Sequence, residues 1–245
     1  MKVFAMSQKG ANKAVGDDRI LIGSNLISEA AFSCRMTTGI IAVADGVGGN
    51  RAGYVASQYV LNRLAMETES VTSESELLDI NRDLLAYSER NPSWKGMATT
   101  VSGLHFLDDA HEILFHVGNT RVYLIQGDKY LRQLTEDDTT VNYLVKTGKL
   151  TDEEAEIYEN RNEIVACFGG DNERLMRPTV KGLNYGSECS YLLTSDGVHE
   201  FLSVDELEDI IVRNEDGFVI CRTIIEEALR NGSEDDLSVI YVEGE

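Results

Sequence analysis

The sequence predicts an α+β fold in which antiparallel sheets pack against separate helices. Three observations indicate this class: strand-length runs rich in Val, Ile and Leu, a hairpin between two of those runs, and capping boxes that mark helix starts. Hairpin-linked strands and separate helices favour this class over a doubly wound sheet. The 245 residues contain no internal repeat, low-complexity tract or proline-rich linker, so we expect one domain over residues 1–245.

Six segments have the apolar composition of strands that are covered on at least one face. They are residues 40–44, 99–106, 112–117, 120–125, 191–194 and 237–242. The short polar stretch 107–111 joins the second segment to the third, and Gly118 and Asn119 separate the third from the fourth. Connections of this kind predict antiparallel pairing.

Helix starts are marked by a Ser or Thr that can cap a backbone amide, with a Glu three residues later that reaches back. This pattern occurs at Ser73–Glu76, Thr151–Glu154 and Ser203–Glu206, and we expect each to open a helix. Apolar residues at helical spacing predict two further helices, over 52–66 and around 218–229.

The charge of the chain excludes one broad class of partner. Asp and Glu number 42 against 22 Lys and Arg, which gives a formal charge of −20. Nucleic acids are bound through basic surfaces, so we expect no nucleic-acid partner. The acidic excess is compatible with cation binding and equally with a solvated surface.

The cysteines and the N-terminus indicate the compartment. The four cysteines (Cys34, Cys167, Cys189, Cys221) are scattered, without CxxC pairs, which is typical of a reduced intracellular protein. The N-terminus has no signal-peptide pattern, and no run approaches the roughly 20 apolar residues that span a bilayer. We therefore expect a soluble, cytoplasmic protein without a membrane partner.

Aspartates occur where apolar segments begin or end. Asp45 and Asp196 each follow an apolar run and precede a Gly, while Asp235 stands before the last run and Asp17 and Asp18 before an early one. A single Asp-Gly is more often only a turn. If these acids converge, carboxylates ~4 Å apart repel by about 1 kcal/mol per pair in water, and divalent cations would offset that repulsion. All-oxygen ligands suit Mg²⁺, Mn²⁺ or Ca²⁺.

These motifs, taken together and in order, resemble those of the bacterial PPM (PP2C-like) family of metal-dependent Ser/Thr protein phosphatases. The matching segments are VADGVGG at 43–49, MATT at 97–100, HVGNTRVYL at 116–124, LTEDDTTV at 134–141, LTSDGV at 193–198 and DDLSV at 235–239. The resemblance extends over roughly residues 5–243. It implies a four-layer α-β-β-α sandwich, two antiparallel sheets flanked by helices.

The resemblance also implies a site that holds two Mn²⁺ or Mg²⁺ ions, with a third, weaker ion beside them. The implied metal-binding residues are Asp45 as the bridging ligand, the Gly46 carbonyl, Asp196, Asp235, Asp17 through a water, Asp18 as a supporting acid and Asp137 at the third ion. Asp45, Asp196 and Asp235 would serve catalysis, in which a metal-bridging hydroxide attacks phosphoserine or phosphothreonine directly. Residues of about 139–175 resemble the flap of bacterial members.

Several positions depart from the family pattern. Lys13 stands where an Arg grips the substrate phosphate, and a Lys is a point charge rather than a bidentate fork. Asp17 replaces Glu, Asn119 replaces Asp, Asp236 replaces Asn, and Val47 occupies the place of a His in animal members. We still expect Lys13 to bind the substrate phosphate.

The changes at Lys13 and Asp17 leave one alternative open, a non-catalytic phosphoprotein-binding regulatory member of the same fold. Other phosphatase classes are excluded, because a Cys nucleophile requires C-x5-R and Glu173 stands six residues after Cys167. The P-loop motif of kinases is also absent. The resemblance implies phosphoprotein substrates, including a cognate Ser/Thr kinase and its targets, and we expect a monomer.

Overall fold

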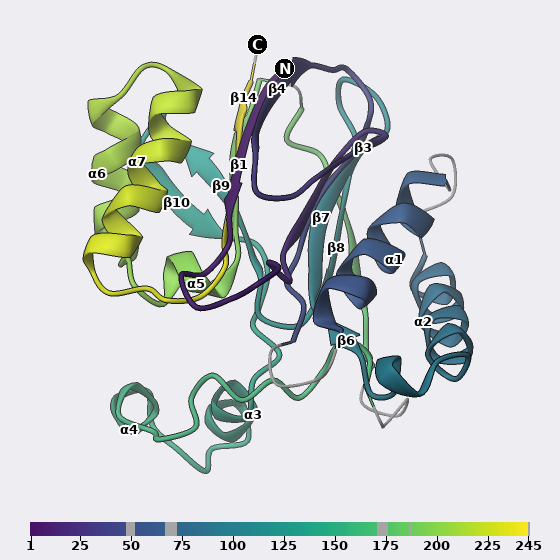
Figure 1. The fold of residues 1–245 in the computed structure, drawn as a ribbon. Coiled ribbons are helices and arrows are strands. Elements are labelled where there is room, and N and C mark those ends of the chain that lie inside the picture. Colours follow the sequence, from purple (N-terminus) through teal and green to yellow (C-terminus); the bar gives the residue numbers. More distant parts are fainter. Residues whose placement is uncertain (48–51, 67–72, 171–175, 187, 245) are drawn as a thin grey trace.

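The computed structural model describes residues 1–47, 52–66, 73–170, 176–186 and 188–244, which form two facing antiparallel sheets with helices on both outer sides (Figure 1). The predicted four-layer α-β-β-α sandwich is therefore confirmed. Gly48 and Gly49 of the VADGVGG segment lie outside the described residues. Within these ranges, no helix has the length and apolar character that crossing a membrane requires.

Each sheet has six strands, and every pairing within it is antiparallel. The first sheet runs in the order β10 (Tyr130–Gln133), β9 (Arg121–Gln126), β13 (Ser190–Thr194), β14 (Leu237–Glu243), β1 (Lys2–Gln8) and β4 (Ala31–Arg35). The second runs β12 (Thr179–Leu183), β8 (Glu112–Val117), β7 (Val101–Phe106), β5 (Gly39–Ala44), β2 (Arg19–Ile22) and β3 (Asn25–Ile27). A short pair, β11 (Phe168–Gly169) with β6 (Ala98–Thr99), extends beside them.

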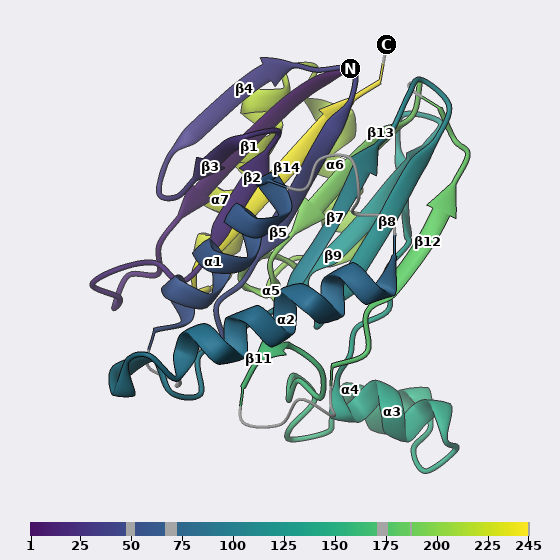
Figure 2. The same ribbon diagram turned by 90° about the vertical axis from the view of Figure 1, so that its right-hand side faces the viewer.

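Helices cover the outer face of each sheet, as Figures 1 and 2 show from two sides. The first sheet is covered by α6 (Val204–Arg213) and α7 (Gly217–Arg230), with the short α5 (Asp196–His199) at one end, and the second by α1 (Gly53–Met66) and α2 (Glu74–Ser88), followed by the 3₁₀ turn Pro92–Trp94. Two further helices, α3 (Thr140–Lys146) and α4 (Asp152–Glu156), lie beyond the end of the sandwich (Figure 1).

The central strands are buried on both faces, which explains their continuous apolar sequences. In β5, Ile40 packs in the cluster between the second sheet and its helices, whereas Ile41 and Val43 face the other sheet. Leu193 and Ile240 of the first sheet meet them in that inner layer. One apolar cluster lies between the two sheets, and one lies between each sheet and its helices. These three clusters hold the four layers of the sandwich together.

The structure corrects the predicted strand 99–106, which divides at Thr100 into β6 and β7. The Thr100 amide donates to the carbonyl oxygen of Asp45 (2.8 Å), and the Thr99 hydroxyl donates to the same oxygen (2.8 Å). The interruption therefore fixes the backbone of a predicted site residue. The other predicted strands and helices are confirmed, with ends shifted by a residue or so.

Candidate active site

Antiparallel pairing brings the predicted acids to one end of the sandwich. Asp45 follows β5, and Asp17 and Asp18 precede its neighbour β2, with Arg19 of β2 opposite Ala44 of β5. In an antiparallel pair the end of one strand lies beside the start of the next. The same rule applies in the other sheet, where Asp196 follows β13 and Asp235 precedes its neighbour β14.

The electrostatics indicate that acids from separate segments lie close enough to affect one another's ionisation. Burial, followed by the charges of Asp196, Asp18 and Asp235, raises the pKa of Asp45 well above its ordinary value. Burial and the charge of Asp235 raise the pKa of Asp196, and burial with the charge of Asp236 raises the pKa of Asp18 to about 7. Asp45, Asp18, Asp196 and Asp235 therefore act on one another, although they come from four places in the chain.

The residues present fit hard divalent cations. Both carboxylate oxygens of Asp18 are buried without a hydrogen-bond partner among the described residues, which is costly unless another group compensates them. Oxygen donors of this kind are the ligands that Mg²⁺ and Mn²⁺ prefer. Within the described ranges, no three acids, histidines or cysteines are grouped closely enough to hold a metal ion as they stand. The ammonium of Lys13 instead lies among three of the acids.

Lys13 is bound by carboxylates on several sides. Its Nζ lies 2.6 Å from Asp235 Oδ1, 2.9 Å from Asp236 Oδ2 and 3.4 Å from Asp17 Oδ2. Partial burial acts to lower the pKa of Lys13, but the hydrogen bonds and charges of Asp235 and Asp236 outweigh it and raise the pKa. Lys13 is therefore held as a cation at the edge of the acid cluster.

Gly46 and Asp17 join this edge of the second sheet to the start of α1. A Cβ on Gly46 would lie 2.5 Å from the carbonyl carbon of Gly53 and 2.9 Å from Asp17 Cβ, so only glycine fits. Asp17 Oδ1 accepts a hydrogen bond from the Tyr54 amide (2.9 Å), and its carbonyl accepts one from the Ser57 hydroxyl (2.6 Å). Asp17 thus caps a helix that begins 36 residues later.

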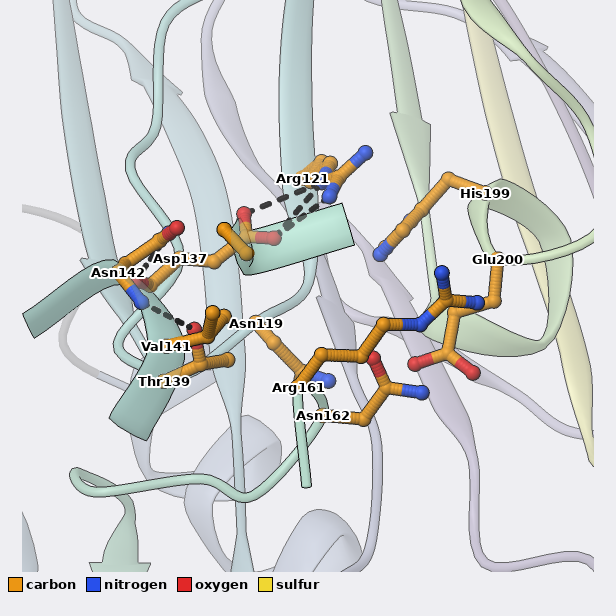
Figure 3. Close-up of a pocket in the computed structure, with 11 residues that line it drawn as sticks. Asn119, Arg121, Asp137, Thr139, Val141, Asn142, Arg161, Asn162, His199 and Glu200 are labelled. Carbon is orange, nitrogen blue, oxygen red and sulfur yellow. Dashed lines mark hydrogen bonds and ion pairs between the residues drawn. The ribbon is translucent and has the colours of Figure 1, made fainter. Parts of the chain in front are cut away.

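Asp137 lies in a neighbouring cavity of about 310 Å³ rather than within the acid cluster. Arg121 donates to both of its carboxylate oxygens, with Nη2 at 2.7 Å from Oδ2, and Figure 3 shows the two side chains facing each other. Arg161 and Glu200 point toward the same space. A third cation at Asp137 would have to share a carboxylate that already holds a guanidinium, and it stays a prediction.

Two residues, Asn119 and Glu200, take part in the site in ways that were not predicted. The Asn119 side-chain amide donates to Asp196 Oδ2 (3.0 Å), and its Oδ1 is buried with no hydrogen-bond partner in the part of the chain that the structure describes. Glu200 lines both the cavity of Asp137 and a second cavity of about 530 Å³ beside Lys13 and Asp235. Burial and the charge of Asp196 raise the pKa of Glu200 to about 7. Its spacing of four residues from Asp196 on a helical turn was the available signal.

The buried histidines have structural partners. His116 contacts the Ser102 hydroxyl through Nδ1 (2.7 Å) and the Glu136 carbonyl through Nε2 (2.8 Å), so its ring is held in the core beside its strand. His199 contacts the Thr194 hydroxyl through Nδ1 (2.9 Å), and burial lowers its pKa well below 6.5. His199 therefore stays neutral near the site.

Comparison with known proteins gives a consistent result. The family model described as "Protein phosphatase 2C" matches residues 22–225. Protein phosphatase PhpP of Streptococcus pneumoniae serotype 2 is 31% identical over 212 residues, which cover 83% of this chain and 85% of PhpP.

Solved structures agree over nearly the whole chain. Serine/threonine phosphatase Stp1 from Staphylococcus aureus superposes with a TM-score of 0.82 at 27% identity, over 99% of this chain and 94% of Stp1. The catalytic domain of the protein phosphatase PstP, in complex with 2 manganese ions, gives a TM-score of 0.76 at 28% identity, over 98% of each chain. The match of the family model and the shared fold show that the chain belongs to the protein phosphatase 2C family.

Proposed function

We propose that the chain is a metal-dependent protein phosphatase that hydrolyses phosphoserine and phosphothreonine in proteins. The observation that carries this function is the convergence of Asp45, Asp18, Asp196 and Asp235 at one end of the sandwich, where burial and mutual repulsion raise the pKa values of three of them. Such a cluster needs cations to be stable in its ionised form. The matched relatives are named as serine/threonine phosphatases, and nothing in them favours a non-catalytic binding role.

We further propose two Mn²⁺ or Mg²⁺ ions, which the manganese complex of the relative PstP supports. The residues that would hold them are Asp45, the Gly46 carbonyl, Asp196 and Asp235, with Asp17 acting through a water, Asp18 as a supporting acid and Asp137 at a third, weaker ion. Divalent cations at these acids supply a lowered pKa for a coordinated water and neutralise charge on the phosphoryl oxygens.

The chain's own groups orient this site. Asn119 fixes the carboxylate of Asp196 through its amide, and Thr99 and Thr100 fix the carbonyl of Asp45. Lys13 lines the second cavity together with Asp196, where its ammonium can bind the substrate phosphate. Val47 has no acidic proton, so the leaving oxygen takes its proton from water.

We propose the segment of about 139–175, of which residues 171–175 lie outside the described residues, as a flap that contributes to substrate choice. Thr139, Val141, Asn142 and Arg161 line the cavity beside Asp196's partner Asn119, which supports contact with a bound phosphoprotein. We also propose that the chain is a cytoplasmic monomer and that it acts on a cognate Ser/Thr kinase and the targets of that kinase.

Hydrolysis assays test the function. We expect the purified chain to hydrolyse p-nitrophenyl phosphate and a phosphothreonine peptide with Mn²⁺, and to stop in chelator. Asp45→Asn should reduce kcat by about a thousandfold or more, because it removes a preorganised electrostatic element of the site. Asp209→Asn is the matched control, since that exposed carboxylate pairs only locally with Arg213 (2.6 Å). A folded protein without metal-dependent hydrolysis of any phosphoprotein would instead favour the non-catalytic binding role.

A further inference from the structure

Two departures from the family pattern, Lys13 and Asp236, contact each other. Asp236 is buried, with a side chain 1% exposed, and its Oδ2 accepts from the Lys13 ammonium (2.9 Å). The same oxygen accepts from the Asp17 amide (2.5 Å), while Oδ1 accepts from the Gly10 amide (2.7 Å). The carboxylate thus ties the segment 10–17 to the start of β14.

A carboxylate is needed at this place, because donors approach both of its oxygens. An amide side chain has only one acceptor oxygen, so an Asn would turn its NH₂ group toward either the Gly10 amide or the Asp17 amide and Lys13. Asp236 therefore brings an extra negative charge beside the acids, and Lys13 compensates it. The two departures form one unit.

Lys13 also contacts acids that the proposed function assigns to the cations. Its ammonium lies 2.6 Å from Asp235 Oδ1 and 3.4 Å from Asp17 Oδ2. A divalent cation bound to the same oxygens would therefore lie close to the ammonium, and the two positive charges would repel each other strongly. The Asp235 side chain is 52% exposed, so this contact can be exchanged, whereas the contact with buried Asp236 is fixed.

We propose that Lys13 is a built-in counter-cation that competes with the divalent cations for Asp235 and Asp17, and so sets their affinity. The inference rests on the proposed function, because it assumes that those acids hold cations. When cations bind, Lys13 gives up Asp235 and remains on Asp236, at the wall of the second cavity. Lys13 thus acts on the cations through the acids that it contacts.

If Lys13 competes with the cations, its removal should lower the stability of the metal-free chain and raise the Mn²⁺ affinity. A lysine with only a structural role would not raise the affinity. Lys13→Met should lower the melting temperature in chelator, because the acids lose their counter-charge. The same variant should bind Mn²⁺ about tenfold more tightly in calorimetric titration. This factor corresponds to the repulsion between a unit charge and a divalent cation a few ångströms apart at high effective dielectric. Lys13→Arg keeps the charge and should bind Mn²⁺ within about twofold of the unchanged chain.

The control for net charge is Lys9→Met. The Lys9 ammonium donates to the Ala14 carbonyl (3.2 Å), so its removal takes the same charge from the same segment without releasing an acid. We expect its Mn²⁺ affinity to stay within about twofold of the unchanged chain, because Lys9 forms no ion pair with an acid of the described residues and its charge is screened. An equal gain in Lys9→Met would overturn the proposal.

Unchanged or weaker Mn²⁺ binding in Lys13→Met would also overturn it. If that variant does not fold in chelator, Lys13→Gln takes its place, since its amide can still donate to Asp236. The measurement needs no substrate, so a failure here is distinct from a failure of the proposed function. Absence of Mn²⁺ binding by the unchanged chain would refute both, whereas Mn²⁺-dependent hydrolysis with an unaltered Lys13→Met affinity would refute only the competing role.

Discussion

At the scale of single residues, the site is built from acids and a histidine whose pKa values differ from their ordinary ones. Burial favours the neutral form of each acid and of His199, because a charge in a low-dielectric interior is poorly solvated. The proposed cations would let the acids keep their charge. His199 has no such partner and remains neutral, with its Nδ1 on the Thr194 hydroxyl.

This state of His199 predicts a pH dependence of stability. Its pKa in the folded chain lies well below the ordinary 6.5, so below pH 6.5 the unfolded chain takes up a proton that the folded chain does not. Stability is therefore lost as the pH falls, by up to about 1.4 kcal/mol per pH unit for this group. His199→Gln should give a flatter loss between pH 6.5 and 5 in urea unfolding. Parallel curves for the two proteins would contradict this account.

At the scale of elements, the sequence predicted a helix or strand correctly where residues within that element mark its start or its burial. All three predicted capping boxes are present, at Ser73, Thr151 and Ser203. Strands buried on both faces were predicted from their apolar runs. By contrast, β1 was missed because its burial alternates and its apolar run is only the four residues 3–6, which Ser7 and Gln8 end.

The capping boxes differ in what they support. Ser203 caps α6, whose Leu207 and Ile211 pack in the core over the first sheet, whereas Thr151 caps the five-residue α4 beyond the sandwich. Ser203→Ala should lower the free energy of unfolding by about 1 kcal/mol, the ordinary value of a cap. Thr151→Ala should leave the global transition unchanged, because α4 can unfold locally. Equal losses in urea titrations would show that α4 belongs to the cooperative core.

At the scale of the whole molecule, the sequence indicated which acids matter but not what surrounds them. Strand ends and the family motifs predicted Asp45, Asp196 and Asp235, since antiparallel neighbours bring such ends together. The contact of Gly10 with Asp236 joins positions 226 residues apart. No local pattern encodes a pairing at that separation, and the same holds for Asn119 with Asp196, 77 residues apart. These contacts follow from strand pairing within the first sheet, where β1 lies beside β14 and β9 beside β13.

The convergence of acids from both sheets makes cation binding a property of the folded molecule alone. The unfolded chain scatters the same acids, so the proposed cations would bind the folded state preferentially. Mn²⁺ at about a hundred times its Kd should add about 2.7 kcal/mol of stability, which corresponds to a rise of roughly 5–10 °C in Tm for a domain of this size. Asp45→Asn should abolish most of this rise in thermal melting. An equal rise in that variant would show that Mn²⁺ acts through the general acidic surface, which carries a formal charge of −20, rather than through the site.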